Sequence, residues 1–544
     1  MALTAEKVRG ELGSIRDTVE SIWVAIVLAF VLRAFMVEAF VIPTGSMAPR
    51  LLGEHWDLAC PSCGYEYAFG GPRDRGSPGP LINRSREHVP SDAHCPNCGA
   101  LCDPLGRYLN GGDRVLVLKY LYRFTEPRPW DVVVFRNPQD NRENYIKRLV
   151  GLPGETIEIV HGDIFVGQSP DGPRRIRRKP PAAQEAMWQV VYDNDYRPDA
   201  RRIRGGGSPQ WVVASGGEDW DLDGLQGRRM AYKGGGQGMG ELAFKAPAGT
   251  FLPHYGYNPL GAEAINPSTD ICSDLRFSLL FIPQAPQSKI ALTLSVLEHR
   301  FRGEFGADGT VRLFYQSKDR PEDPWELWSE SKLDRPLTTG QGYEVALAHV
   351  DFSVALWVDG RVVLEIADRY PETYDSLRQR LADVMHRPIP TPEVRICAWG
   401  GGSELLHVKL CRDVYYTATG KDAVKLGPLG ELARRIGVVD KTPGWGTMGY
   451  PIHLAKHPQD PDLDEFFMLG DNSPQSLDGR GWTSAAPTLR LYGDSGEPIY
   501  QLGTVPRYNL IGKAFFVYWP AGFRLPGLPG LPIVPNVGKL RPIR

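Results

Sequence analysis

Hydrophobic alternation typical of β-strands occurs in two groups of segments that lie far apart in the chain. The first group spans residues 113–166 and includes DRVLVLKYL, DVVVFRNP, NYIKRLVGLPGE and TIEIVHGDIFV; the second, within 466–519, holds FFMLGD and NLIGKAFFVYW. Short runs with a period of two favour half-buried strands. We therefore expect a mainly β fold in which one domain is split by two insertions. Its pieces are residues 43–53, 111–167 and 461–522.

The composition argues against some classes of partner. The 544 residues carry a formal net charge of -2, so the chain has no basic surplus with which to bind nucleic acid over a long surface. Its 60 glycines and 47 prolines exceed average usage and indicate many turns and extended connections. Residues 523–544 are rich in proline, which predicts an extended tail rather than a second spanning helix.

An apolar segment near the N-terminus predicts a membrane anchor. Residues 22–32, IWVAIVLAFVL, are uncharged, and the apolar character continues to residue 42. A helix of this length spans about 30 Å of hydrocarbon. The alternative is the core of a removable signal peptide, but no Ala-x-Ala-like cleavage site follows it. Because basic residues precede the segment, we expect residues 1–20 in the cytoplasm, a transmembrane anchor at 21–42 and the rest of the chain outside.

The first insertion, residues 54–110, carries two C-x-x-C-G motifs, CPSCG and CPNCG. This spacing lets both sulfurs of each turn reach one tetrahedral ion, which predicts a structural zinc ribbon. Two disulfides are the alternative if the region faces an oxidising space. The expected ligands are Cys60, Cys63, Cys95 and Cys98. The spacing of the other four cysteines decides no pairing; they are Cys102, Cys272, Cys397 and Cys411.

The second insertion, residues 168–460, contains repeated short strands separated by turns. One of them is the hairpin LWVDGRVVLEI, with an Asp-Gly turn. The pattern predicts a β-sandwich of the jelly-roll kind over about residues 190–415. It resembles the concanavalin-like sandwiches that recur as carbohydrate-binding or laminin-type modules. The resemblance implies glycan binding as one role to test, although most of the aromatic residues are expected in the core.

The stretch VIPTGSMAPRLL (41–52) places Ser46 just after the apolar segment, without the G-x-S-x-G frame of a hydrolase that uses a histidine base. In the strand NYIKRLV, alternation puts Lys147 on the same face as Tyr145 and Leu149. Desolvation there is expected to lower the lysine pKa from about 10.4 towards neutrality. The free amine could then take the proton of Ser46. The alternative is a solvated lysine on an edge strand.

Five motifs occur in one order: IPTGSMAP, GDRVLVLK, YIKRLVGLPGE, LGDNSPQSLDGRGW and VPRYNLIGKAFFVYWP. Together they resemble the type I signal peptidases of bacteria, over residues 20–53, 111–166 and 465–522. The resemblance implies a serine endopeptidase of the cytoplasmic membrane that needs no catalytic cofactor. It would cleave signal peptides from exported pre-proteins after small residues, through an acyl-enzyme. The implied partners are signal peptides, the lipid bilayer and the secretion translocon.

The resemblance also implies a role for each matching residue. Ser46 is the expected nucleophile and Lys147 the general base. The Thr44 hydroxyl and the Ser46 N–H are expected to form the oxyanion hole. Ser476 is expected to hydrogen-bond the lysine amine and orient it. The supporting residues are the ion pair of Asp478 and Arg480 and the GDN turn with Asp471 and Asn472.

Six apolar or aromatic positions match the walls of the family's small substrate pockets, which would admit alanine and reject larger side chains. They are Phe40, Ile42, Met47, Leu51, Tyr145 and Ile146. Two positions depart from the family pattern. Arg50 stands where threonine is usual, and Gly479 where serine is common. Neither change removes a catalytic atom, but Arg50 is expected to alter the pocket rim or the surface that faces the membrane.

Two alternatives keep the β scaffold but change its role. Self-cleaving repressors of the SOS response also use a Ser/Lys dyad, but a DNA-binding N-terminal domain is expected there and this chain has an apolar segment instead. The other alternative is a non-enzymatic envelope protein on a decayed peptidase scaffold. Retention of Ser46, Lys147, Ser476 and Asp478 argues against decay.

Overall fold

Strands form most of the regular structure in the computed structural model of this protein. The described residues are 18–27, 36–71, 93–102, 109–119, 121–198, 210–234, 238–246, 249–259, 265–384, 386–418, 444–489, 500–520 and 536–544. Within them the labelled α-helices are short: α2 (Leu121–Phe124), α3 (Pro181–Met187), α4 (Gly224–Gly227) and α5 (Tyr374–Ala382). The mainly β fold expected from the alternation is therefore confirmed.

One antiparallel sheet joins the two groups of strand segments that are far apart in the sequence. Its order is β1-β5-β29-β6-β7-β27-β28, and β30 pairs with β29. The bounds are β1 (Val37–Val41), β5 (Arg114–Lys119), β29 (Leu510–Trp519), β6 (Val132–Arg136), β7 (Asn144–Gly151), β27 (Glu465–Leu469), β28 (Val505–Pro506) and β30 (Arg541–Pro542). Strands β6 and β7 thus lie between β29 and β27, as a split domain requires.

Period-two alternation places successive residues of this sheet in two different cores. On β6, Val132 and Val134 join one apolar cluster, whereas Val133 and Phe135 join another. Both clusters are buried, so the sheet is covered on both faces around β6 and β7. A lysine on β7 is consequently held away from water.

Two smaller sheets connect this domain to the insertions. The first has the order β10-β9-β8-β26, with bounds β8 (Thr156–Val160), β9 (Asp163–Gly167), β10 (Arg175–Ile176) and β26 (Ile452–His453). The second has the order β3-β2-β4, with bounds β2 (His55–Ala59), β3 (Glu66–Gly70) and β4 (Leu109–Asn110). An apolar cluster packs Phe467 of β27 against Met187 of α3 and Tyr416, so the second insertion shares a core with the split domain.

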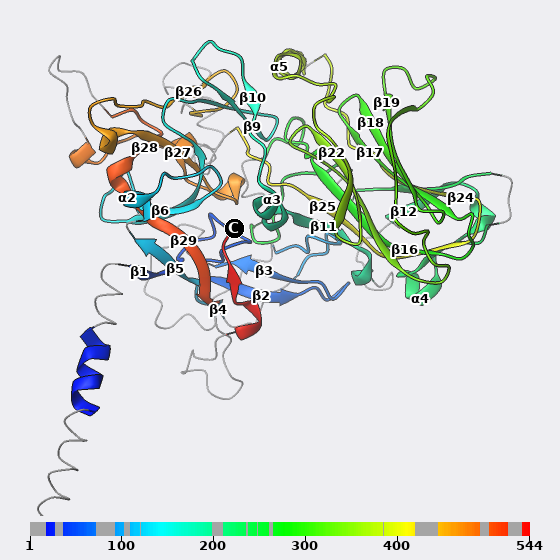
Figure 1. Cartoon of the computed structure of the whole chain (residues 1–544), viewed down its shortest axis with the longest axis horizontal. Coiled ribbons are helices and arrows are strands. Elements are labelled where there is room, and N and C mark those ends of the chain that lie inside the picture. The colour runs from blue at the N-terminus through cyan, green and yellow to red at the C-terminus, as the bar shows by residue number, and fades with distance from the viewer. Residues whose placement is uncertain are drawn as a thin grey trace, which may run out of the picture.

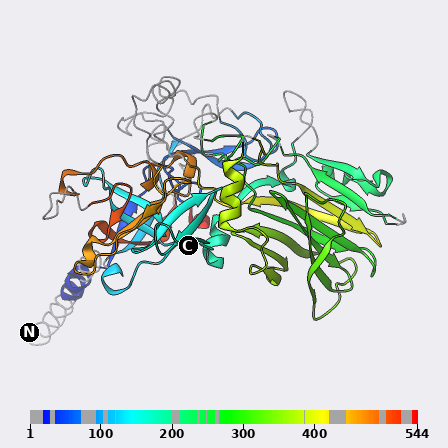
Figure 2. The same ribbon diagram turned by 90° about the horizontal axis from the view of Figure 1, so that it is seen from above.

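The second insertion contains two antiparallel sheets that enclose one large apolar core, which confirms the predicted β-sandwich. One sheet has the order β13-β14-β25-β16-β21-β22-β23, with β11 beside β25; the other has the order β12-β15-β24-β17-β18-β19-β20. The first comprises β11 (Gln189–Asp193), β13 (Trp220–Asp221), β14 (Met230–Tyr232), β16 (Leu275–Pro283), β21 (Tyr343–Val350), β22 (Ser353–Val358), β23 (Arg361–Ile366) and β25 (Ser403–Arg412). The second comprises β12 (Trp211–Ser215), β15 (Gly240–Phe244), β17 (Lys289–Val296), β18 (His299–Gly306), β19 (Thr310–Ser317), β20 (Glu326–Lys332) and β24 (Val394–Trp399). In Figures 1 and 2 the green sandwich lies beside the split domain.

The predicted Asp-Gly hairpin joins β22 to β23. Asp359 and Gly360 have φ values of 48° and 73°, and Val358 pairs with Arg361 across the turn. Two successive positive φ values match the right-handed twist of the flanking strands, which is why a β-hairpin favours this dipeptide.

Both ends of the chain differ in part from the sequence-based expectation. Residues 18–27 are helical and largely exposed, and 28–35 lie outside the described residues. Val37–Val41, expected as the end of the anchor, instead form β1 and pair with β5. Within the described part of the chain, no helix has both the length and the apolar character needed to cross a bilayer. At the other end, part of the expected extended tail forms β30, where Arg541 pairs with Val517.

Candidate active site

The structure brings Ser46 and Lys147 together. Lys147 Nζ lies 2.6 Å from Ser46 Oγ, within hydrogen-bond distance. Lys147 lies on β7 between β6 and β27, and its side chain is 3% exposed. The Tyr145 ring centroid is 5.2 Å from the amine, on the face that alternation predicted. The alternative of a solvated edge lysine is therefore wrong, and the two groups have the geometry of a nucleophile and its base.

The GDN turn after β27 holds the backbone of the serine loop. The Asn472 N–H donates to Ser46 O at 3.1 Å, and its side-chain amide donates to Gly45 O at 3.0 Å. Asn472 is fully buried, as is Asp471 beside it. A Cβ on Gly470 would lie 2.5 Å from Ser46 O, so only glycine fits against the serine loop at this position. The turn thus fixes where the Ser46 hydroxyl points.

An ion pair between β7 and the GDN turn was missed by the sequence reasoning. Arg148 Nε and Nη2 donate to the Asp471 carboxylate at 2.7 and 2.6 Å, and both side chains are buried. Burial alone would lower the pKa of Arg148, but the charge of Asp471 and its hydrogen bonds raise it. Alternation only showed that Arg148 faces away from Lys147. Its position on the core face of an interior strand was the signal that it needs an acidic partner.

The expected ion pair between Asp478 and Arg480 is fully buried. Arg480 Nε and Nη2 donate to the Asp478 carboxylate at 2.9 and 2.8 Å, and the Gly470 N–H also donates to it at 3.0 Å. Arg480 reaches further, to Ser473 and to the Thr417 carbonyl oxygen at 2.6 Å. The pair therefore joins the loop after β27 to the end of the sandwich chain.

The pKa of Asp478 predicts how this pair responds to acid. Burial raises the pKa, but the charge and hydrogen bonds of Arg480 and the bond from the Gly470 amide outweigh burial and lower it. A lowered folded-state pKa gives stability that is complete above the unfolded value of about 3.9 and is lost as pH falls through the folded value. Asp478→Asn is therefore expected to destabilise the domain at pH 7 and to differ less from the parent below about pH 4.

Urea unfolding of parent and variant at several pH values measures this difference. Asp375→Asn, on the exposed first turn of α5, controls for removing a carboxylate from the surface. A stability gap between Asp478→Asn and the parent that stays constant or widens in acid would contradict the assignment of the ion pair.

Two other expected catalytic residues make no hydrogen bond through their side chains. Thr44 is exposed beside the serine, and its hydroxyl has no hydrogen-bond partner within the described residues. The Ser476 hydroxyl is buried, and it too makes no hydrogen bond among those residues. The bond expected from Ser476 to the lysine amine is thus not formed in this conformation.

Four of the expected pocket residues lie in one buried apolar cluster, and they are Ile42, Met47, Leu51 and Ile146. Phe40 packs at the margin of this cluster and is half-buried. Tyr145 is in the cluster on the other face of the sheet, where it contacts Phe135. The structure therefore brings five of the six positions together and separates Tyr145 from them.

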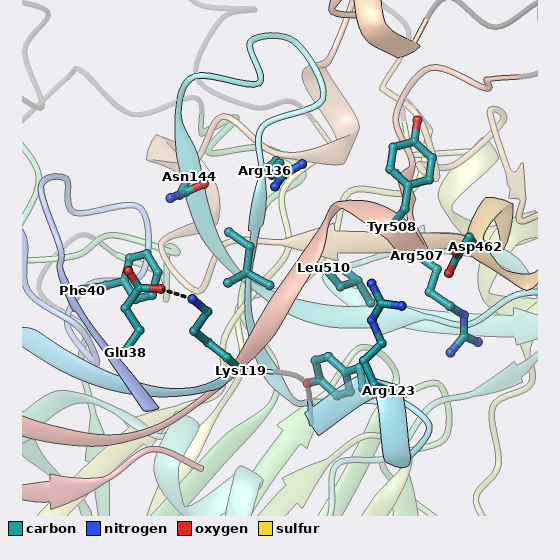
Figure 3. A pocket seen from close by; sticks show the side chains of 12 residues that line it. Glu38, Phe40, Lys119, Arg123, Arg136, Asn144, Asp462, Arg507, Tyr508 and Leu510 are labelled. Carbon is teal, nitrogen blue, oxygen red and sulfur yellow. Dashed lines mark ion pairs between the residues drawn. The ribbon is translucent and has the colours of Figure 1, made fainter. Parts of the chain in front are cut away.

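A pocket of about 420 Å³ opens next to Phe40 (Figure 3). Neither Ser46 nor Lys147 lines it. Its basic side chains come from four elements; they are Lys119, Arg123, Arg136 and Arg507. Lys119 forms an ion pair with Glu38 of β1 at 3.1 Å. Sequence reasoning missed this pocket, because its lining converges from segments that alternation describes only one at a time.

The two departures from the family pattern have structural explanations. Arg50 donates to the Trp188 carbonyl oxygen at 3.2 Å and to the Glu185 carbonyl oxygen at 3.4 Å. It thus binds the end of α3 in the second insertion. A Cβ on Gly479 would lie 2.6 Å from both the Gly503 carbonyl oxygen and the Phe467 ring, so a serine has no room there.

The four cysteines of the C-x-x-C motifs form one cluster. Their sulfurs all lie within 4.8 Å of one another, and the pairs Cys60–Cys98 and Cys63–Cys95 are 3.6 Å apart. A disulfide requires about 2.0 Å, so the disulfide alternative is wrong. Zinc–sulfur bonds of about 2.3 Å give sulfur separations near 3.8 Å. The residues fit a metal ion with four thiolate ligands.

The same turn presents each pair of sulfurs. Gly64 N–H donates to Cys60 O at 2.8 Å, and Gly99 N–H donates to Cys95 O at 2.9 Å. The two glycines have φ values of 79° and 71°, a conformation that side chains rarely adopt. All eight cysteines of the chain are unpaired thiols.

Comparison with known proteins points to one family. The family model described as signal peptidase, peptidase S26, matches residues 106–198 and 456–519. A signal peptidase I from Leptolyngbya laminosa is 33% identical over 91 residues, which cover 15% of this chain and 39% of the relative. A probable signal peptidase I-1 from Synechocystis is 30% identical over 121 residues, which cover 20% of this chain and 56% of the relative. The chain thus spans roughly half the length of these relatives or less.

Solved structures resemble this chain only weakly. Carbohydrate-binding module CBM66 from Bacillus subtilis has a TM-score of 0.23 at 11% identity, covering 37% of this chain and 94% of that one. The endo-β-1,3(4)-glucanase SCLam of family GH16 has a TM-score of 0.26 at 12% identity, and the match covers 48% of this chain and 97% of that one. These scores carry no argument about the sandwich. The split β domain, on both sides of the second insertion, is the part of this chain that is similar to the signal peptidase family, peptidase S26.

Proposed function

We propose that this chain is a signal peptidase that cleaves exported pre-proteins with a Ser46–Lys147 dyad. The observation that carries the proposal is the distance of 2.6 Å between Lys147 Nζ and Ser46 Oγ, with the lysine buried. A neutral lysine amine takes the proton of Ser46 as Oγ attacks the carbonyl carbon before the scissile bond. The protonated amine then gives this proton to the leaving nitrogen. Water activated by the same amine releases the acyl group.

The negative charge that develops on the substrate carbonyl oxygen must be stabilised by hydrogen-bond donors. The Ser46 N–H and the Thr44 hydroxyl supply them in this proposal, and each is worth about 3 kcal/mol of the barrier. Exposure of Thr44 and its lack of a hydrogen-bond partner among the described residues leave its hydroxyl available to a substrate. The buried apolar residues behind Ser46 leave little depth for a side chain, which supports a preference for alanine before the scissile bond.

The proposed setting is the bacterial cytoplasmic membrane, with the translocon as the source of substrate. The uncharged apolar run at residues 22–32 supports this setting by composition. Confinement of enzyme and substrate to one surface raises their effective concentration without any additional contact.

Sequencing the N-terminus of the product, after cleavage of a pre-protein in detergent or lipid, tests activity and cleavage site together. Intact geometry of the dyad argues against a decayed scaffold.

We also propose that the cysteine cluster holds one structural zinc ion. Four thiolates leave no open coordination position, so the ion supports the fold of the ribbon and takes no part in cleavage.

Cys95→Ser is expected to remove the bound zinc from the purified chain, because three thiolates and a hydroxyl bind it far less tightly. Mass spectrometry of metal content is the measurement, with about one zinc ion per parent chain expected. Cys272→Ser is the matched control, since this cysteine is also buried but lies in the second insertion, outside the four-cysteine cluster. Equal zinc in Cys95→Ser and the parent would exclude this site.

A further inference from the structure

Residues 251–258 of the second insertion reach back to the GDN turn. Asn258 and Asn472 form a reciprocal amide pair, with N–O distances of 2.8 and 2.7 Å. Their exposed fractions are 2% and 0%. The Asn472 amide nitrogen has two hydrogens, one for Asn258 and one for the Gly45 carbonyl oxygen. Asn258 therefore fixes the rotation of the side chain that holds the backbone beside Ser46.

Two tyrosines of the same segment make further contacts around the serine. The Tyr255 hydroxyl donates to the Asp471 carbonyl oxygen at 2.7 Å. The Tyr257 ring covers Gly45 so closely that a Cβ there would lie 2.0 Å from Tyr257 Cε1. Both rings are buried, with 4% and 3% exposure. The segment thus supports the serine loop and the GDN turn at once.

The other side of the segment is fixed to the sandwich. Arg412 is fully buried on β25, and its guanidinium carbon lies 4.4 Å from the Tyr255 ring centroid. Arg412 also donates to the His254 carbonyl oxygen at 2.8 Å. A continuous set of contacts therefore runs from β25 through Tyr255 to the turn that holds Ser46. Figure 1 shows the sandwich beside the split domain.

We propose that residues 251–258 are a positioning element of the active site, so that the sandwich insertion is required for cleavage and is no independent appendage. This inference rests on the proposed peptidase function. The family match ends at residue 198 and resumes at residue 456, so nothing in it assigns a role to this segment. Three parts of the chain position Ser46: the loop that follows β1, the GDN turn, and a segment of the inserted domain.

Asn258→Ala in the full chain is expected to lower kcat about 10²-fold with little change in KM, because a small displacement of a catalytic group lowers the rate by that order. The probe is a synthetic peptide with an Ala-x-Ala sequence, cleaved in detergent. Asn194→Ala is the matched control: Asn194 is 1% exposed in the same insertion and donates to the Gly227 carbonyl oxygen at 3.1 Å, away from the site. It is expected to keep the parent kcat.

Tyr255→Phe is a milder second variant, in case Asn258→Ala does not fold. It removes the hydroxyl that donates to the Asp471 carbonyl oxygen, and Tyr232→Phe, which removes a partly buried bond to the Gly238 carbonyl oxygen, is its control. If kcat falls no further in Asn258→Ala and Tyr255→Phe than in their controls, the proposal is overturned while the peptidase function stands.

Hydrogen exchange tests the same contacts without any assay of activity. Amides of residues 45–48 are expected to exchange faster in Asn258→Ala than in Asn194→Ala or the parent. Unchanged exchange in Asn258→Ala overturns the positioning role. A parent chain that cleaves no peptide, but whose exchange responds as expected, overturns the proposed function and leaves the support of the serine loop standing.

Discussion

Replacing Ser46 with alanine, or Lys147 with methionine, is expected to reduce cleavage of a pre-protein by at least about 10⁴-fold. Alanine removes the attacking oxygen. Methionine fills a similar volume at the buried position on β7 but has no amine to take the proton from Ser46 Oγ, 2.6 Å away. Because the two groups act as a unit, the double variant is expected to lose little more than either single variant. The rate of product formation, measured with the N-terminus of the product, reports the effect.

Controls separate loss of chemistry from loss of fold. Lys513→Met removes a lysine from β29 of the same sheet, where Lys513 pairs with Asp131 at 2.5 Å, and it is expected to keep activity. Ser484→Ala removes an exposed hydroxyl that contacts only Gln139 among the described residues. Cleavage by Ser46→Ala or Lys147→Met at the parent rate would disprove the dyad.

Replacing Arg148 with methionine is expected to destabilise the split β domain by about 3–5 kcal/mol. Asp471 would then keep a buried negative charge without the bidentate partner that now lies 2.6–2.7 Å away. Because the chain has several domains, the loss is best measured locally, as hydrogen exchange of the β7 and β27 amides. These amides are expected to lose protection by an amount that corresponds to this free energy.

The double variant Arg148→Met/Asp471→Leu tests the cause. Apolar replacement of both partners is often neutral, so most of the protection is expected to return. Arg142→Met, which removes an exposed ion pair with Asp140, is the control and is expected to leave protection unchanged. Full protection in the single variant would show that the buried pair contributes little.

Several features could be predicted from the sequence because their physical cause is local. Period-two alternation assigned Lys147 to a covered face, and the structure buries it between β6 and β27. Two C-x-x-C-G motifs predicted four sulfurs around one point, since each turn presents its pair in the same way. The Asp-Gly dipeptide predicted its hairpin because its backbone conformation belongs to those two residues.

Other features could not be predicted, because their partners are hundreds of residues apart. Arg148 and Asp471 are 323 positions apart, and Asn258 and Asn472 are 214 apart. Nothing local to Arg50 shows that its guanidinium binds the end of α3. A buried charge or amide requires a partner, but only packing of the whole chain decides which distant segment supplies it.

The sequence by itself therefore determined which reactive groups the chain carries: a serine, a lysine on a covered strand and a cluster of four cysteines. Only the tertiary structure decided that the serine loop is held partly by the inserted domain, through Asn258 and Tyr255. The physical reason is that residue type and periodicity set which way each side chain points and whether it requires a hydrogen-bond or ion-pair partner when it is buried. Which buried group serves as that partner depends on how the separate layers of the structure pack.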